Sequence, residues 1–174
     1  MRKLALCIML LVSLADAGAA EEGKQNTFSI GSLGFSMEVP VAEGRTHGAY
    51  QVAAFLLPAS DGFAPNVNVQ KQAYEGTIED YDKLSTGQFT ALKLTSVNRT
   101  LKKDEVIYEY KGLMQGSRLH WYARALKKGQ YVYLVTATAL DSQWKDEKKK
   151  KKLIDSVNSF KFETKPGPGI TQPN

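Results

Sequence analysis

Apolar and polar residues alternate along much of this chain with the period of two that is typical of half-buried β-strands. The alternation predicts strands at 28–30, 35–39 and 66–72, and a continuously apolar run at 49–57 predicts a central strand. Four more β-rich segments follow at 94–101, 105–114, 117–127 and 130–140, separated by two or three residues. Connections this short are typical of antiparallel hairpins.

Two segments show helical spacing instead. The first begins at Thr77, with Asp80 placed as in a capping box, and its apolar residues continue to Leu92. The second runs from about Ser142 to Ser159, and its apolar positions are Trp144, Leu153, Ile154, Val157 and Phe160. Strands followed by one helix, twice over, predict an α+β domain in which two main helices pack on an antiparallel sheet.

Composition fits a single globular domain. The chain has 174 residues, of which 43% are hydrophobic and 24% charged, and this argues against collagen-like and largely disordered classes. Residues 21–90 carry four Lys or Arg against nine Asp or Glu, whereas 91–174 carry seventeen against eight. The basic second half favours acidic partners or an anionic membrane surface. No nucleic-acid recognition motif accompanies it, so we expect no nucleic-acid partner.

The first twenty residues predict export. Met1-Arg2-Lys3 precedes an eleven-residue run that is apolar except for one serine, and small residues follow it. This is the pattern of a secretory signal peptide with cleavage near Ala17–Ala20, and the run is shorter than the roughly 20 residues that cross a bilayer. Cleavage removes the single cysteine, which suits an oxidising compartment. We therefore expect a periplasmic or secreted protein.

The mature chain divides into three parts. Residues 21–26 read as a flexible leader, and residues 27–162 as the folded domain. Residues 163–174 hold three prolines and two glycines, a composition that predicts a disordered tail without a regular β-ladder.

Three short segments carry a likeness to a known family. They are GFSMEVP at 34–40, APNVNVQ at 64–70, and SFKF at 159–162. In these segments, and in its order of strands, helix, strands and helix, the chain resembles the PsbP-like superfamily of α/β/α sandwiches. That superfamily includes the photosystem II extrinsic protein PsbP, a Ran-binding release factor and bacterial DcrB-type envelope proteins. The resemblance covers residues 27–162 and implies a binding or assembly module without catalysis.

The residues that catalysis or metal binding would need are sparse. The only histidines are His47 and His120, and no Gly-x-Ser-x-Gly elbow, phosphate-binding loop or dinucleotide fingerprint occurs. No pair of histidines has the spacing of metal ligands, and the mature chain lacks cysteine. We therefore expect no enzyme activity, no cofactor and no metal site.

One predicted strand offers a candidate ligand site. Its alternation places Arg118, His120, Tyr122 and Arg124 on one side, opposite Leu119, Trp121, Ala123 and Ala125. Two arginines flanking a histidine and a tyrosine could bind a carboxylate, a phosphate or an acidic peptide. If Asn66, Asn68 and Gln70 share that side, a continuous surface of amides and cations results. The alternative is an ordinary exposed polar face.

A run of lysines marks the second helix: Lys148, Lys149, Lys150, Lys151 and Lys152. Five successive helical residues sweep about 400° around the axis, so the lysines cannot share one face. Asp146 and Glu147 are expected to pair with Lys150 and Lys151. The run is either a solvated helix face or a contact for an anionic membrane or an acidic partner.

Together these features predict an exported, non-enzymatic binding or assembly protein of the bacterial cell envelope, whose partner is an envelope protein. Two alternatives remain open. One is a carrier of a small anionic ligand on the Arg118 and Arg124 face, and the other is a peripheral membrane protein that uses Lys148–Lys152.

Overall fold

The computed structural model describes residues 27–30, 35–38, 44–45, 51–163 and 170–171. The predicted signal peptide at 1–20 and leader at 21–26 lie outside these residues. The described helices and strands are β1 (Thr27–Ile30), β2 (Phe35–Glu38), β3 (Gly44–Arg45), β4 (Gln51–Leu56), β5 (Asn66–Ala73), α1 (Ile78–Ala91), β6 (Thr95–Lys102), β7 (Glu105–Met114), β8 (Ser117–Lys128), β9 (Tyr131–Leu140), the 3-10 helix η2 (Gln143–Lys145), α2 (Glu147–Ser159), β10 (Lys161–Phe162) and β11 (Ile170–Thr171). In the described part of the chain, no helix has the length and hydrophobicity to cross a membrane.

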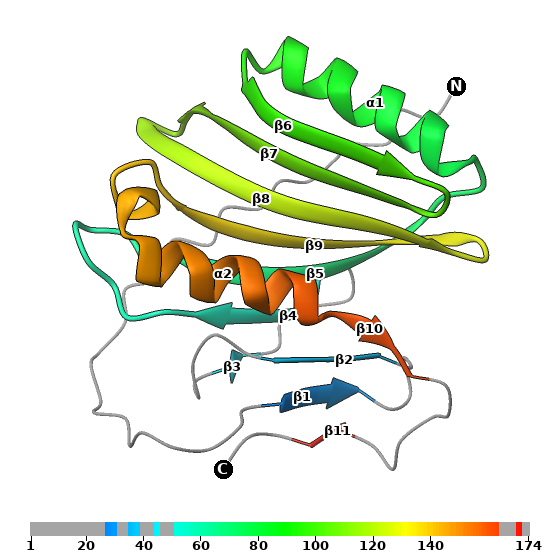
Figure 1. Ribbon diagram of the computed structural model, residues 1–174, viewed down its shortest axis with the longest axis horizontal. Coiled ribbons are helices and arrows are strands. Elements are labelled where there is room, and N and C mark those ends of the chain that lie inside the picture. The colour runs from blue at the N-terminus through cyan, green and yellow to red at the C-terminus, as the bar shows by residue number, and fades with distance from the viewer. Residues whose placement is uncertain (1–26, 31–34, 39–43, 46–50, 164–169, 172–174) are drawn as a thin grey trace.

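The strands form two antiparallel sheets (Figure 1). The larger sheet has seven strands in the order β3-β4-β5-β9-β8-β7-β6. The smaller has four in the order β10-β2-β1-β11. Strands β6 to β9 form the meander that the sequence predicts, because each connection is a tight turn and each strand pairs with the next. The predicted α+β fold with an antiparallel sheet and two main helices is confirmed.

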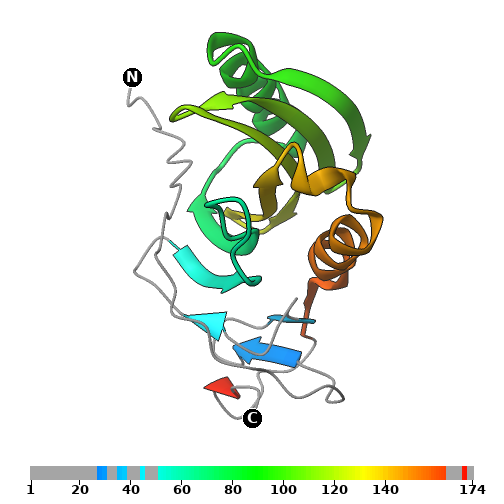
Figure 2. The same cartoon turned by 90° about the vertical axis from the view of Figure 1, so that its left-hand side faces the viewer.

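The two helices pack on opposite faces of the large sheet. On β9, Val135 and Ala137 belong to the cluster that includes residues of α2, whereas Val132 and Leu134 belong to the cluster under α1. Figures 1 and 2 show α2 across the middle strands and α1 beside β6. Strand β9 is thus buried on both faces, and each helix covers a different part of the sheet.

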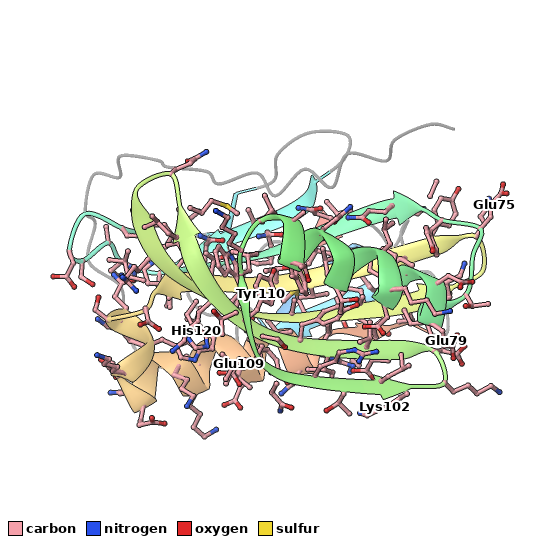
Figure 3. The ribbon with its side chains drawn as sticks, turned by 90° about the horizontal axis from the view of Figure 1, so that it is seen from above. Glu75, Glu79, Lys102, Glu109, Tyr110 and His120 are labelled. Carbon is pink, nitrogen blue, oxygen red and sulfur yellow. The ribbon has the colours of Figure 1, made fainter. Side chains whose placement is uncertain are left out.

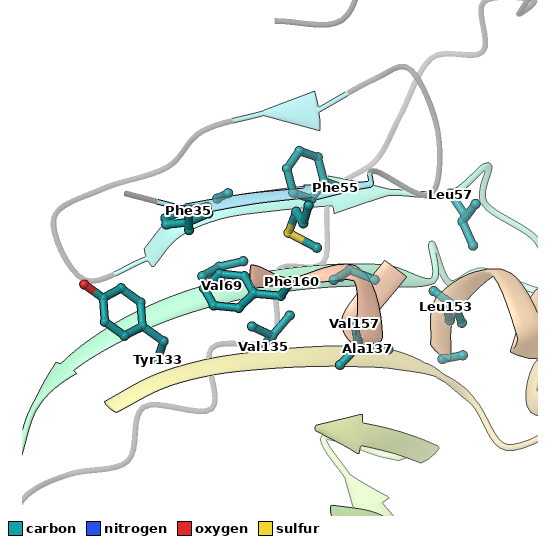
Figure 4. Packing of buried hydrophobic residues seen from close by; sticks show 14 of the residues in the cluster. Phe35, Phe55, Leu57, Val69, Tyr133, Val135, Ala137, Leu153, Val157 and Phe160 are labelled. Carbon is teal, nitrogen blue, oxygen red and sulfur yellow. The ribbon is translucent and has the colours of Figure 1, made fainter. Parts of the chain in front are cut away.

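The core under α2 also joins the two sheets (Figure 4). Phe35 of β2 and Phe160, which follows α2, have ring centroids 5.0 Å apart. Val157 from α2 and Val69 from β5 are fully buried in the same cluster. Burying side chains of this size contributes roughly 1.5–3 kcal/mol each, so this cluster holds the small sheet against the large one.

Helix α1 begins as the sequence predicts. The Thr77 hydroxyl accepts a hydrogen bond from the Asp80 backbone N–H, and the Asp80 carboxylate accepts one from the Thr77 backbone N–H. Asp82 is buried on the helix face that packs on the sheet, where it forms an ion pair with Arg99 of β6. This ion pair fixes α1 to the last strand of the sheet.

Two predicted elements differ in the structure. The predicted helix from Ser142 to Ser159 is divided, because the Asp146 side chain accepts hydrogen bonds from the N–H groups of Lys148 and Lys149. An N-cap requires extended backbone, so α2 begins at Glu147 and η2 precedes it. Within the apolar run at 49–57, Gln51–Leu56 form β4, which lies second from the edge of the sheet, not in its centre.

The predicted tail also differs in part. Ile170 and Thr171 form β11 and pair with Ile30 and Ser29 of β1. The prediction that 163–174 holds no β-ladder is therefore wrong at these two residues. A strand of two residues is compatible with the flanking prolines and glycines because it needs only a short stretch of extended backbone.

Two glycines differ in whether their backbone conformation requires glycine. Gly87 lies inside α1 with open space where a Cβ would point, whereas Gly116 has a φ of +81° in the turn between β7 and β8. Glycine costs a helix interior roughly 0.5–1 kcal/mol relative to alanine. We expect Gly87→Ala to raise the free energy of unfolding by about that amount, and Gly116→Ala to lower it because alanine is strained at this φ. Urea unfolding measures both variants, and destabilisation by Gly87→Ala would contradict the helix packing described above.

Candidate functional site

Strand β8 places the predicted polar residues on the α2 side of the sheet. Tyr122 pairs in register with Ala137 of β9, whose side chain lies in the core under α2. Trp121 and Ala123, one residue to either side, belong to the core under α1. The predicted alternation is therefore confirmed. The polar side is not an open surface, however, since the His120 side chain is only 7% exposed and that of Arg124 only 13%.

His120 forms the centre of a buried polar cluster. Its Nε2 atom lies 2.9 Å from Oε1 of Glu109 on β7, and its Nδ1 atom lies 3.2 Å from Oδ1 of Asp141, directly after β9. Figure 3 shows Glu109 and His120 side by side. The indole of Trp144 stacks on the imidazole with centroids 4.5 Å apart and donates a hydrogen bond to the same Glu109 oxygen. The cluster links β7, β8 and η2.

The charges of this cluster stabilise one another. An ionised carboxylate only accepts hydrogen bonds, so the imidazole can donate to Glu109 and Asp141 together only in its positively charged form. The hydrogen bond from His120 is the main reason that the pKa of Asp141 lies below its ordinary value of 3.8. Burial acts in the opposite direction, and Lys111 and Lys145 lower the pKa of Asp141 further. The arrangement holds the imidazole between Glu109 and Asp141, and we refer to the contact with Asp141 as the ion bridge.

Arg124 is engaged as fully as His120. Its Nε atom donates to Glu105 of β7 at 2.7 Å. Its Nη1 atom faces the carbonyl oxygens of Val157, Asn158 and Phe160 at 3.2, 2.8 and 3.4 Å. These carbonyls lie at the C-terminal end of α2, where a helix favours a cation. Arg124 therefore connects α2 to the sheet. It could bind an anionic ligand together with Arg118 only if these hydrogen bonds broke.

The other two residues of the β8 set lie at different depths. The Tyr122 hydroxyl donates to Oδ1 of Asn158 at 3.1 Å and so also contacts α2. Arg118 is exposed near the start of β8, where its backbone carbonyl accepts a hydrogen bond from Asp141. Of the four residues, Arg118 alone has an exposed side chain.

The amide residues of β5 lie on the other face of the sheet. Asn66 pairs with Thr138 and Asn68 with Thr136, and these threonines pair in turn with Trp121 and Ala123. Directly opposed residues share a face, so the expected continuous surface of amides and cations does not form. Within the described chain, the Asn68 Oδ1 atom is buried and has no hydrogen-bond partner.

The lysines of α2 are largely paired along the helix. Lys149 lies 3.9 Å from Asp146, Lys150 lies 3.7 Å from Glu147, and Lys151 lies 2.5 Å from Asp155. Of the predicted pairs, Glu147 with Lys150 is present, whereas Asp146 lies beside Lys149 and Lys151 lies beside Asp155. Lys148 and Lys152 are exposed one helical turn apart. Exposed pairs such as these contribute about 0–1 kcal/mol each.

No group of three or more potential ligands is placed to hold a metal ion in the described residues. The His120 cluster illustrates the geometry, because Glu109 and Asp141 meet opposite nitrogens of the ring. Metal ligands have to converge on one point, and these carboxylates do not.

The partners of His120 and Arg124 were not predicted from the sequence. Glu105 and Glu109 alternate correctly on β7, and Asp141 follows β9, but their roles depend on strand register. Trp144 was assigned to the apolar side of the second helix, and it is indeed buried. The signal in the sequence was the alternation of acidic residues on one predicted strand and basic residues on the next. Pairing those strands could have predicted these ion pairs.

The fold with its two helices on opposite faces of an antiparallel sheet is that of a PsbP-like protein. The chain is similar to the cyanobacterial PsbP protein, CyanoP, from Synechocystis sp. PCC 6803, with a TM-score of 0.57 and 14% sequence identity over 84% of this chain and 98% of that chain. It is also similar to PA94 from Pseudomonas aeruginosa, a protein of unknown function, with a TM-score of 0.48 and 18% identity over 70% of this chain and 89% of that chain. No family model matches the sequence, and no curated protein matches it. The predicted PsbP-like fold is thus confirmed.

The ion bridge to Asp141 predicts a pH-dependent stability. Because the pKa of Asp141 is lowered by folding, its stabilisation is complete above the pKa of the unfolded chain and is lost as the pH falls through the lower pKa of the folded chain. The side chain is 34% exposed, so we expect Asp141→Asn to cost about 0.5–1 kcal/mol at pH 7. Urea unfolding should show that this difference shrinks below about pH 4.

An exposed carboxyl supplies the control for this prediction. Asp155→Asn on α2 removes only an ion pair along the helix and should change stability by less than about 0.5 kcal/mol at either pH. A cost of Asp141→Asn that stays constant from neutral to acidic pH would contradict the ion bridge.

The two arginines of β8 should differ sharply in stability. Arg124→Ala leaves Glu105 and the end of α2 without their cation, and we expect a loss of about 2–4 kcal/mol. Arg118→Ala removes an exposed side chain and should stay within about 0.5 kcal/mol of the wild type. Equilibrium denaturation measures both, and similar losses would show that Arg124 does not anchor α2.

Proposed function

We propose that the protein is an exported, non-enzymatic binding or assembly protein of the bacterial cell envelope. Support for export comes from the signal-peptide pattern at 1–20. Support for binding comes from the surface, and support for the lack of catalysis comes from the His120 cluster. A general base needs an available lone pair, and both ring nitrogens of His120 already face carboxylates.

One observation carries the binding role. Among the described residues, the exposed large apolar side chains all fall within one stretch of sequence, namely Leu84, Leu92, Val97, Leu101 and Leu113. Leu84 and Leu92 lie on α1 and at its C-cap, and the others lie on β6 and at the end of β7. Single exposed apolar residues are ordinary. Leu84, Leu92, Val97 and Leu101, however, all come from α1 and the edge strand that follows it, and apolar side chains concentrated in one region are typical of a protein contact. Leu113 is separate from them, because it pairs with Arg118 on the α2 side of the sheet. We refer to Leu84, Leu92, Val97 and Leu101 as the α1–β6 end.

The first experiment tests export. The full chain is expressed in a bacterium with two membranes, the cells are fractionated, and the N-terminus of the recovered protein is sequenced. We expect it in the periplasm or the medium, with an N-terminus created by cleavage between Ala17 and Glu21. Recovery from the cytosol with residues 1–20 retained would overturn the proposal.

The second experiment tests the partner surface by affinity capture from envelope extract. The wild type should recover a stoichiometric protein partner, and the double variant Leu92→Glu with Leu101→Glu should lose it because charges are then buried in the contact. The matched control is Lys148→Glu with Lys152→Glu, which should retain the partner. Melting temperatures close to that of the wild type establish that each variant is folded.

The alternatives give different results in the same assays. Loss of the partner only in the lysine variant, with sedimentation on anionic vesicles that disappears at high salt, would replace the proposal by a peripheral membrane role. A rise in melting temperature with an anionic metabolite, abolished by Arg118→Ala, would favour a ligand carrier. Repeated failure of capture together with turnover in an activity screen would show an enzyme.

A further inference from the structure

The large sheet ends at β6. Strand β7 is the only described strand that pairs with it, so alternate N–H and C=O groups of β6 point away from the sheet. All eight residues from Thr95 to Lys102 are exposed. A long exposed edge of this kind attracts other strands unless it is blocked.

A β-bulge, one of the features that block such an edge, is present and covers only part of β6. The register shifts between Ser96 and Asn98, which marks a β-bulge. From Asn98 to Lys102 the strand runs in regular register with Glu109 to Glu105 of β7. Five regular residues span about 17 Å. Arg99 turns toward Asp82 of α1, which leaves the outer backbone of this stretch uncovered by described residues.

The charge around β6 limits what can pair with it. From Lys83 to Lys103 the chain has five lysine or arginine residues and no aspartate or glutamate. Arg99 and Lys102 face the carboxylates of Asp82 and Glu105. Lys93 and Lys103, just before and just after the strand, form no ion pair with any described residue. A second copy of the chain, added across a two-fold axis, would bring like charges together, and this is unfavourable.

We propose that β6 accepts an extended, acidic segment of a partner protein as an additional β-strand. Main-chain hydrogen bonds to the regular stretch would supply affinity. A carboxylate at one end of the segment would face Lys103, which adjoins the regular stretch, and a carboxylate at the other end would face Lys93 beyond the bulge. Apolar side chains of the segment would meet Leu101 in the regular stretch and Val97 at the bulge, which are 40% and 48% exposed. The inference rests on the proposed function, since it names the mode by which the α1–β6 end binds its partner.

The probe is a blocked ten-residue peptide with two glutamates at each end and alternating threonine and valine between them. A second peptide has lysines in place of the glutamates. Binding to the mature protein is measured by fluorescence anisotropy, and the bound segment is located by hydrogen exchange. We expect the acidic peptide to bind more tightly than the basic one and to slow amide exchange in β6.

A charge exchange makes the test specific. The double variant Lys93→Glu with Lys103→Glu should lower the affinity for the acidic peptide by about tenfold, the effect of losing two exposed ion pairs. The same variant should bind the basic peptide more tightly. Lys148→Glu with Lys152→Glu changes the same charge on α2 and should leave both affinities unaltered. Unchanged melting temperatures confirm that both variants are folded.

Three results would overturn the inference: no binding of the acidic peptide up to about 1 mM, slowed exchange outside β6, or no effect of the charge exchange. The capture experiment described above does not use these peptides. If capture depends on Leu92 and Leu101 while the peptides fail, the binding function stands and strand addition at β6 is wrong.

Discussion

The register of β9 against its two neighbours determines which residues lie under each helix. Val135 and Ala137 pack toward α2, while Val132 and Leu134 pack toward α1. Because the side chains of a strand alternate between its faces, a shift of one residue would exchange the two faces and expose both cores. The polar chemistry follows the same alternation. His120 therefore lies under η2 and α2, and Asn68 lies on the opposite face.

The parts of the fold that depend on neighbouring residues were predictable from the sequence. The capping box at Thr77 and the hairpins between β6 and β9 each arise from residues a few positions apart. The start of α2 also depends on neighbouring residues. The predicted helix nevertheless began too early, at about Ser142, because Trp144 was counted among its apolar positions. The Asp146 cap that begins the helix was treated instead as an ion-pair partner. A short polar residue before a helix has two uses, and only the backbone conformation distinguishes them.

The parts that depend on distant residues were not predictable. Asn66 pairs with Thr138, and the two are separated in sequence by more than half of the folded domain. Nothing in the sequence of either strand indicates which strand it pairs with. For this reason the amide face of β5 could not be placed relative to Arg118 and Arg124 beforehand. The same holds for β11, since Ile170 and Thr171 become a strand only because β1 offers an edge.

The two ends of the large sheet are therefore held to different degrees. Around α2, the bonds of His120 and Arg124 join strands, helix and core, and breaking any one of them leaves a buried polar group unpaired. Around β6, the Asp82–Arg99 ion pair joins the strand to α1 and β7 pairs along one edge, but all eight residues, including Val97 and Leu101, stay exposed. Regions with few buried contacts open at lower free energy than the rest of a domain. A strand that adds to β6 would supply the missing edge, so binding would be strongest where the isolated domain is least complete.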